Sequence, residues 1–350
     1  MQSKICFAIP TWNRANKLKL AVEEIASQIM EEGIDATIFI SDNFSDDDTP
    51  KIISELIAKY SFITFMRRQS HGGVFDNFAD VTEHATGRYI WWFGDDDRLL
   101  PGGLKLVMNH LNDETIAFIS AGNGSFKPHS GKVVADTLLG LCNRLGWNQI
   151  LGWMSADILR SDVAQKACLL IRQEPYKLDA YAHVGATLAV AANLNAIHID
   201  CPIVEPQGEQ EKVDLERWDK ENIGWRYFLL IDTFKYMFEQ KIFTKKFHPD
   251  FFKYLNYYLW DRFITNMIAW SVNNDISKER GWLLINFIAE MIDDPNTKKN
   301  ILIRNSSAQQ LCADRKLLMN QIKQNEQRLS VLLKETSQTT LPLGYLSKDK

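Results

Sequence analysis

Apolar and polar residues alternate in a regular order along the first hundred positions. Short apolar runs predict buried strands at 5–9, 36–40, 63–66 and 89–94. The segments between them repeat apolar residues every three or four positions, which predicts amphipathic helices at 17–30, 50–60 and 74–84. This strand–helix alternation predicts an α/β domain with a mostly parallel central sheet and helices on both faces.

After residue 100 the pattern becomes less regular. It predicts a helix at 104–111 and strands at 116–121, 132–134 and 196–199. Asn123-Gly124 and Ser130-Gly131 are turn signals, which favours direct pairing of the strands at 116–121 and 132–134. The polar segment 205–225 is typical of a loop that closes over a ligand or of a disordered linker.

From residue 225 onward the pattern is helical without strand alternation. We therefore predict two domains, 1–225 and a helical 226–350, with helices at 227–238, 251–270, 281–292 and 308–333. Aromatic residues and lysines between 241 and 263 suit either an anionic membrane surface or a packed helical domain with a solvated basic loop.

The last predicted helix, 308–333, has two interpretations. Its apolar residues fit a loose spacing of three and four, which favours a short coiled coil that joins copies into a homo-oligomer. Asn325 and either Asp314 or Arg315 interrupt that seam, so an amphipathic helix packed on its own domain is the alternative.

Composition narrows the class of protein. The 350 residues are 45% hydrophobic and 24% charged with a net charge of -4, which argues against a nucleic-acid binder. Five scattered cysteines without a CxxC pair indicate neither a zinc site nor a disulfide framework. No signal-peptide pattern and no apolar run of ~20 residues occurs. We expect a cytoplasmic protein, at most peripheral on the cytoplasmic face of the inner membrane.

Polar loops follow three of the predicted strands, at 10–14, 42–48 and 95–97. Ligands of parallel sheets bind beyond the carboxyl ends of the strands, so these loops predict one shared crevice. The three carboxylates Asp95, Asp96 and Asp97 need positive charge if they are buried, and Mg²⁺ or Mn²⁺ with a diphosphate co-ligand would supply it. The alternative for the three aspartates is a solvated acidic turn. The alternative for Thr11–Arg14 is the capping segment of a helix.

Four motifs carry a resemblance to a known family. Ile9-Pro10-Thr11-Trp12-Asn13-Arg14 resembles the opening motif of family-2 glycosyltransferases of the GT-A fold. Ser41 to Asp47 resembles their second motif, and Gly73 with Asn77 and residues 87–90 resembles their third region. Asp95-Asp96-Asp97 with Pro101-Gly102 is similar to their metal-binding DxD element, and the preceding Trp-Trp-Phe-Gly resembles abequosyltransferase-type enzymes of bacterial surface glycans.

The resemblance implies a Rossmann-like GT-A domain that moves a sugar from a nucleotide-sugar donor to a hydroxyl of a glycan or lipid-linked acceptor, with inversion. Asp42 would bind the base and Asp95 would lie near the ribose and the cation. Asp97 would bind the cation. Because Gly94 stands where the family has its first Asp, the register of the motif is open, and Asp96 is the alternative ligand. The implied nucleotide site comprises Pro10, Thr11, Asn13, Arg14, Asp42, Asn43, Gly73, Asn77, Asp95 and Asp96.

The family also implies an acidic general base after the acceptor-side segment 148–159. Its usual pair of adjacent acids is missing here, which leaves Asp179 as the first candidate and His183 as the second. Four residues apart on a helix, the two would share a face. Both could instead have structural roles, Asp179 at a helix start and His183 in the core.

Two other functions remain open. A nucleotidyltransferase could use the same crevice and cation, but it would need a glycine-rich phosphate loop after the first strand, and residues 10–16 contain no glycine. A non-catalytic sugar- or nucleotide-binding module would bind ligand without turnover.

Overall fold

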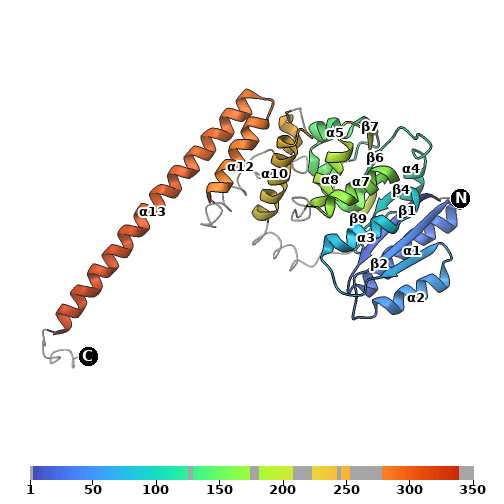
Figure 1. Cartoon of the computed structure of the whole chain (residues 1–350), viewed down its shortest axis with the longest axis horizontal. Helices are drawn as coiled ribbons and strands as arrows, with labels where there is room; N and C mark the ends of the chain where they lie inside the picture. The colour runs from blue at the N-terminus through green and yellow to red at the C-terminus, as the bar shows by residue number, and fades with distance from the viewer. Residues whose placement is uncertain are drawn as a thin grey trace, which may run out of the picture.

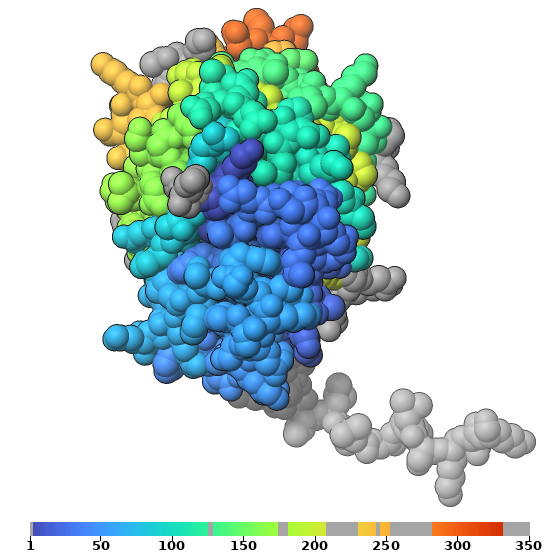
Figure 2. Space-filling model, turned by 90° about the vertical axis from the view of Figure 1, so that its right-hand side faces the viewer, coloured from blue at the N-terminus to red at the C-terminus, as the bar shows by residue number. Residues whose placement is uncertain are grey.

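The structure, a computed structural model, describes residues 3–124, 129–173, 181–207, 223–242, 246–252 and 278–338. An α/β body holds the N-terminal part of the chain, and α13 runs away from it (Figure 1). In Figure 2 the first hundred residues, in blue, fill the lower half of the face, and the green residues that follow lie above them.

The first half of the sheet is parallel, as the sequence predicts. Its order is β3-β2-β1-β4, with β1 (Ser3–Thr11) paired to both β2 (Ala36–Asp42) and β4 (Gly87–Trp92), and β3 (Ile63–Arg67) at the edge. The connecting helices are α1 (Ala15–Glu32), α2 (Thr49–Lys59) and α3 (Val74–His84). The carboxyl ends of these strands therefore meet at one edge of the sheet.

The second half makes the sheet mixed rather than mostly parallel. The order continues β4-β8-β6-β9-β5, and only β6 with β9 is parallel there. The strands are β5 (Asp97–Leu99), β6 (Phe118–Asn123), β7 (Val133–Thr137), β8 (Asp157–Arg160) and β9 (Asn195–Pro206). The predicted direct pairing of β6 with β7 is wrong, because both strands pair with β9 instead.

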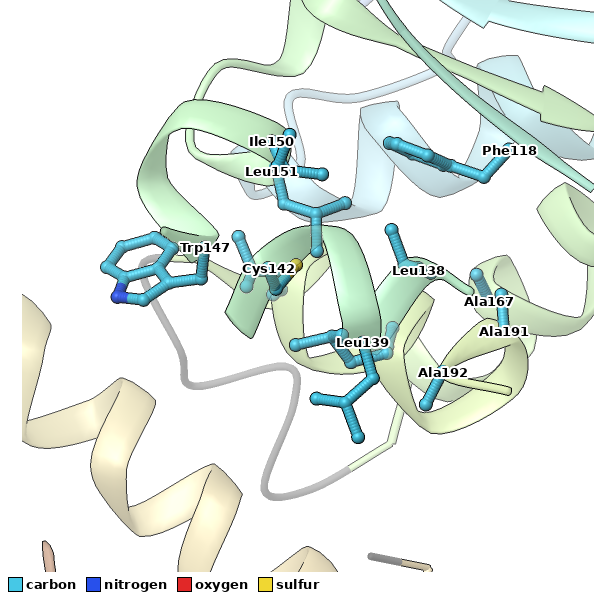
Figure 3. Packing of buried hydrophobic residues seen from close by; sticks show 14 of the residues in the cluster. Phe118, Leu138, Leu139, Cys142, Trp147, Ile150, Leu151, Ala167, Ala191 and Ala192 are labelled. Atoms are coloured by element: carbon cyan, nitrogen blue, oxygen red, sulfur yellow. The ribbon is translucent and has the colours of Figure 1, made fainter. Parts of the chain in front are cut away.

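Each face of the sheet has its own apolar core. One is covered by α1, α2 and α4 (Gly103–Met108). The other is covered by α3, α5 (Leu138–Leu145), α6 (Trp147–Leu151), α7 (Ser161–Ile171) and α8 (Ala182–Ala191). Figure 3 shows Leu138, Leu139 and Cys142 of α5 between Trp147 and the alanines of α7 and α8. The predicted α/β class is confirmed.

The C-terminal helices extend the second core. They are α10 (Ile223–Glu239), the short η3 (Pro249–Phe252), α12 (Lys278–Met291) and α13 (Pro295–Gln338). Phe234, Phe251 and Ile285 belong to the same cluster of buried residues as Leu138. The helical C-terminal region is confirmed, and the boundary at 225 stays a prediction because apolar packing continues across it. Most of the predicted helix 251–270 lies outside the described residues.

Within the described ranges, no helix combines the length and the apolar character that crossing a membrane requires.

Asp157, the first residue of β8, is a buried carboxyl group in the sheet. Its side chain is fully buried, and neither carboxyl oxygen has a hydrogen-bond partner among the described residues. Burial raises the pKa of Asp157 well above its ordinary value because a charge in the core has no water to solvate it. The folded protein therefore favours the protonated, neutral form.

We predict that Asp157 makes the protein less stable as pH rises. The folded state keeps the proton that the unfolded state releases above pH ~4, so the free energy of unfolding falls by up to about 1.4 kcal/mol per pH unit. Asp157→Asn, which stays neutral, should flatten this part of the profile, measured by urea denaturation between pH 5 and 8. Exposed Asp35→Asn is the control and should leave the slope unchanged.

Candidate functional site

The loop after β1 and the aspartates after β4 form one bonded unit. Thr11 Oγ1 donates to Asp95 Oδ2 at 2.7 Å. Arg14 Nη1 lies 2.8 Å from Asp95 Oδ1 and 2.8 Å from Asp96 Oδ2. Because β1 and β4 are parallel neighbours, the pairing of the strands itself brings these two loops together.

Burial dominates the electrostatics of this unit. It raises the pKa of Asp95 to about 6, although the Arg14 guanidinium acts in the opposite direction. Burial and the neighbouring Asp96 raise the pKa of Asp97 to about 7. A further positive charge near these groups would lower both pKa values and stabilise the carboxylates.

Asp97 points to other partners than Asp95 does. Its Oδ2 accepts hydrogen bonds from Trp153 Nε1 at 3.0 Å and from the Ser155 hydroxyl. Ser155 lies in a short 3₁₀ turn, η1 (Met154–Ala156), and its Oγ also accepts the Gly94 N–H at 2.8 Å. A Cβ on Gly94 would lie 2.7 Å from Asp97 Oδ2, so a larger residue at this position would require the Asp97 carboxyl group to shift.

The loop after β2 is tied to the loop after β1. Asp42 is 1% exposed, and its Oδ1 accepts the Ser45 N–H at 3.0 Å. Arg67 Nε lies 3.5 Å from Asp42 Oδ2. Asn13 adopts φ 52° and binds both Ser45 and Asp46. The predicted base-binding Asp42 is therefore an internal anchor of its own loop in this structure.

Two asparagines fix the third side of the crevice. Asn77 on α3 donates to Ser41 O at 3.0 Å and accepts from Ser41 Oγ at 2.6 Å. Asn43 donates to Gly72 O and accepts from Gly72 N, both at 2.9 Å. Gly73 caps the start of α3. The ends of β1, β2 and α3 thus hold one another through polar side chains.

These loops surround a cavity of about 480 Å³, a volume typical of small-molecule sites. Of the predicted site residues, its lining includes Pro10, Thr11, Arg14, Asn43, Gly73, Asn77, Asp95 and Asp96. Asn13, Asp42 and Asp97 are not part of the lining; they bind residues of the neighbouring loops instead.

The apolar part of the wall was missed by sequence reasoning. The Trp12 ring is 49% exposed and lies 4.4 Å from the His71 ring, and Phe75 and Met154 also line the cavity. Aromatic residues are common in buried strands and cores, so nothing in the sequence marks Trp12 as a surface wall.

Gln207, at the end of β9, was also missed. Its Nε2 donates to Asp97 O at 3.2 Å and to Lys17 O at 2.9 Å, and its N–H donates to Asp96 O at 2.9 Å. The side chain thereby holds the backbone of the aspartate loop against α1. A glutamine in a polar segment carries no sequence signal for such a role.

The residues present fit a divalent cation only in part. Within the part of the chain that the structure describes, no three His, Cys, Asp or Glu side chains converge as a metal cluster. Mg²⁺ and Mn²⁺ often use one or two carboxylates and take further oxygens from substrate phosphates. Asp95 and Asp97 fit that incomplete ligand set, with raised pKa values that a cation would reverse.

The structure describes only one of the two candidate general bases. Asp179 lies outside the described residues. His183, on α8, is 8% exposed, and its Nε2 lies 3.0 Å from Leu151 O. Burial lowers the pKa of His183 to about 4. The structure does not bring His183 to the cavity; its ring packs among the helices of the second core.

Comparison with known protein families gives a match in the N-terminal part of the chain. Residues 6–151 match the family described as glycosyl transferase family 2. These residues are similar to family-2 glycosyltransferase domains. The matched stretch includes most of β1, all of β2 to β4, the aspartates and the cavity lining except Met154, so the resemblance inferred from the motifs is confirmed.

Characterised relatives are similar over a limited stretch. Abequosyltransferase RfbV of Salmonella typhimurium is 34% identical over 33% of this chain and 34% of its own length. The GalNAc(5)-diNAcBac-PP-undecaprenol beta-1,3-glucosyltransferase of Campylobacter jejuni is 30% identical over 31% of this chain and 35% of its own. The chain thus spans about a third of these relatives.

A solved structure with a related outline is S. aureus TarS 1–349 in complex with UDP-GlcNAc. It superposes with a TM-score of 0.49 at 13% identity, covering 86% of this chain and 89% of that chain.

We predict that Ser155→Ala destabilises the protein by about 1–3 kcal/mol, because a buried Gly94 N–H and the Asp97 carboxyl both lose a partner. Urea denaturation measures this as a lower midpoint with an unchanged slope. Ser54→Ala is the matched control: exposed Ser54 donates only to Pro50 O within α2, so its loss should cost less than ~0.5 kcal/mol. Equal effects of the two changes would contradict the role of Ser155.

Proposed function

We propose that the protein is a glycosyltransferase that moves a sugar from a nucleotide diphosphate sugar to an acceptor hydroxyl. The observation that carries this proposal is the Thr11–Asp95–Arg14 unit on the wall of the cavity, inside the stretch that is similar to family-2 domains. A leaving diphosphate needs positive charge beside it as its bond to the sugar breaks. The Arg14 guanidinium supplies one such charge, and a cation held by the neighbouring carboxylates would supply another.

The chain's own residues have separate tasks in this proposal. Arg14 attracts the diphosphate, and Thr11 orients Asp95 through its hydroxyl. Asp95 and Asp97 would hold Mn²⁺ or Mg²⁺, which when bound neutralises charge on the leaving diphosphate. The apolar wall of Trp12 and Phe75 excludes water from the donor, which limits hydrolysis.

The acceptor hydroxyl needs a base within hydrogen-bond reach. We propose Asp179 for this role, in a single displacement that inverts the anomeric carbon. Asp42 keeps its proposed role of binding the base, and Asn13 keeps its proposed place in the nucleotide site; in this structure, both bind residues of the loop after β2.

The names of the relatives guide the choice of acceptor. One acts as an abequosyltransferase, and the other is named for an undecaprenol-linked glycan. We propose a glycan or lipid-linked glycan acceptor in bacterial surface glycan synthesis, with the protein in the cytoplasm and peripheral on the membrane. Association of two copies through the C-terminal helices belongs to the same proposal and is argued below.

Calorimetric titration of UDP, GDP, CDP and dTDP, each with and without Mn²⁺, tests the site. We expect one nucleotide to bind with Mn²⁺ and to lose at least about tenfold in affinity, ~1.4 kcal/mol, in Asp97→Ala. Asp35→Ala, which removes an exposed carboxylate, should bind as the wild type does. Sugar transfer or slow hydrolysis is then measured with the sugar nucleotides of the base that binds.

The outcomes separate the parts of the proposal. Binding that does not depend on Mn²⁺ would remove the cation and keep the donor site. Binding without any turnover would favour a non-catalytic module. If no nucleotide binds under either condition, the roles of Thr11, Arg14 and the aspartates are withdrawn.

A further inference from the structure

α13 is a 44-residue helix that stands mostly free of the body. Ile301 and Asn305, near its start, are buried against α12. Every residue from 313 to 331 is exposed within the described parts of the chain. Figure 1 shows α13, in orange and red, leading away from the other elements. A long helix without tertiary contacts is only marginally stable in water, so packing against a partner would stabilise α13.

The exposed part of α13 carries a regular apolar stripe. Leu311, Leu318, Ile322 and Leu329 are exposed by 68%, 57%, 42% and 58%. Their separations of seven, four and seven residues are those of a coiled-coil seam. Arg315 and Asn325 occupy the two seam positions between them.

The stripe is symmetric about residue 320. Leu311 and Leu329 are equally far from it, and so are Leu318 and Ile322. The two polar members, Arg315 and Asn325, form the third such pair. When two copies of this helix run in opposite directions, each seam residue therefore faces the second copy's seam residue that lies equally far from residue 320 on its other side.

We propose that two copies of this chain associate through α13 as an antiparallel coiled coil. Leucine then packs on leucine or isoleucine in four layers, and the Arg315 guanidinium meets the Asn325 amide oxygen of the second copy in the other two. A parallel pair would instead place Arg315 against the second Arg315, where like charges repel.

Charges beside the seam favour the same direction. Asp314 and Arg328 lie on one flank, each one residue before a seam position. Antiparallel packing brings Asp314 of each copy next to Arg328 of the other, twice by symmetry. Asp314 also accepts a hydrogen bond from Gln310 on its own helix at 2.9 Å. In a parallel pair the two charges are 14 residues, about 21 Å, apart.

Light scattering of the full chain after gel filtration tests the dimer. We expect twice the 40.3 kDa mass of one chain. Leu318→Glu should weaken association at least about tenfold. Leu317→Glu is the matched control: Leu317 is 61% exposed but lies about 100° around the helix from Leu318, so this variant should remain a dimer. Near-UV circular dichroism checks that the α/β body stays folded in both variants.

Charge reversal tests the direction. Asp314→Arg and Arg328→Asp should each weaken the dimer, and the double variant should recover wild-type affinity, because the pair is rebuilt with opposite signs. Additive losses without recovery would rule out the antiparallel packing. A wild-type chain that is monomeric at every concentration would overturn the interface altogether, and nucleotide binding would be unaffected by that result.

Discussion

The need to hold three adjacent carboxylates at the end of a buried strand governs the crevice. Asp95 and Asp97 are buried at 4% and 6% exposure, and one partly exposed guanidinium, Arg14, binds Asp95 and Asp96. Hydrogen bonds from Thr11, Trp153 and Ser155 offset part of the cost. The remaining cost of burial raises the pKa of Asp95 to about 6 and that of Asp97 to about 7, and an additional positive charge nearby would stabilise both carboxylates.

The rest of the fold keeps this arrangement rigid. The aspartate loop is held from three directions: by β1 through Thr11, by η1 through Ser155, and by β9 through Gln207. η1 and β9 both follow β4 in the chain, so the site depends on residues outside the first four strands. A packed core on each face of the sheet then fixes the strands that carry these three contacts.

The sequence is informative where structure is local. The runs at 5–9 and 36–40 and the helix at 74–84 follow from short-range periodicity, and the structure has all three. The pairing of β6 with β9 depends on residues about 80 positions apart, which turn signals at 123–131 cannot reveal. The roles of Gln207 and Ser155 could not be predicted for the same reason: they depend on contacts between loops that are far apart in the sequence. The placement of His183 beside Leu151 likewise depends on contacts between distant segments, which its position in the sequence does not reveal.

α13 shows how exposure changes the meaning of a sequence pattern. Taken from the sequence alone, Asn325 and either Asp314 or Arg315 interrupt an apolar seam and argue against a coiled coil. Because residues 313 to 331 are exposed, the apolar residues of the seam need a partner helix to bury them. Arg315 and Asn325 then determine the direction in which that partner runs. Their equal distance from residue 320 makes them neighbours in an antiparallel pair and makes Arg315 repulsive in a parallel one. A polar pair that costs stability in any arrangement then favours the one arrangement in which each member has a partner.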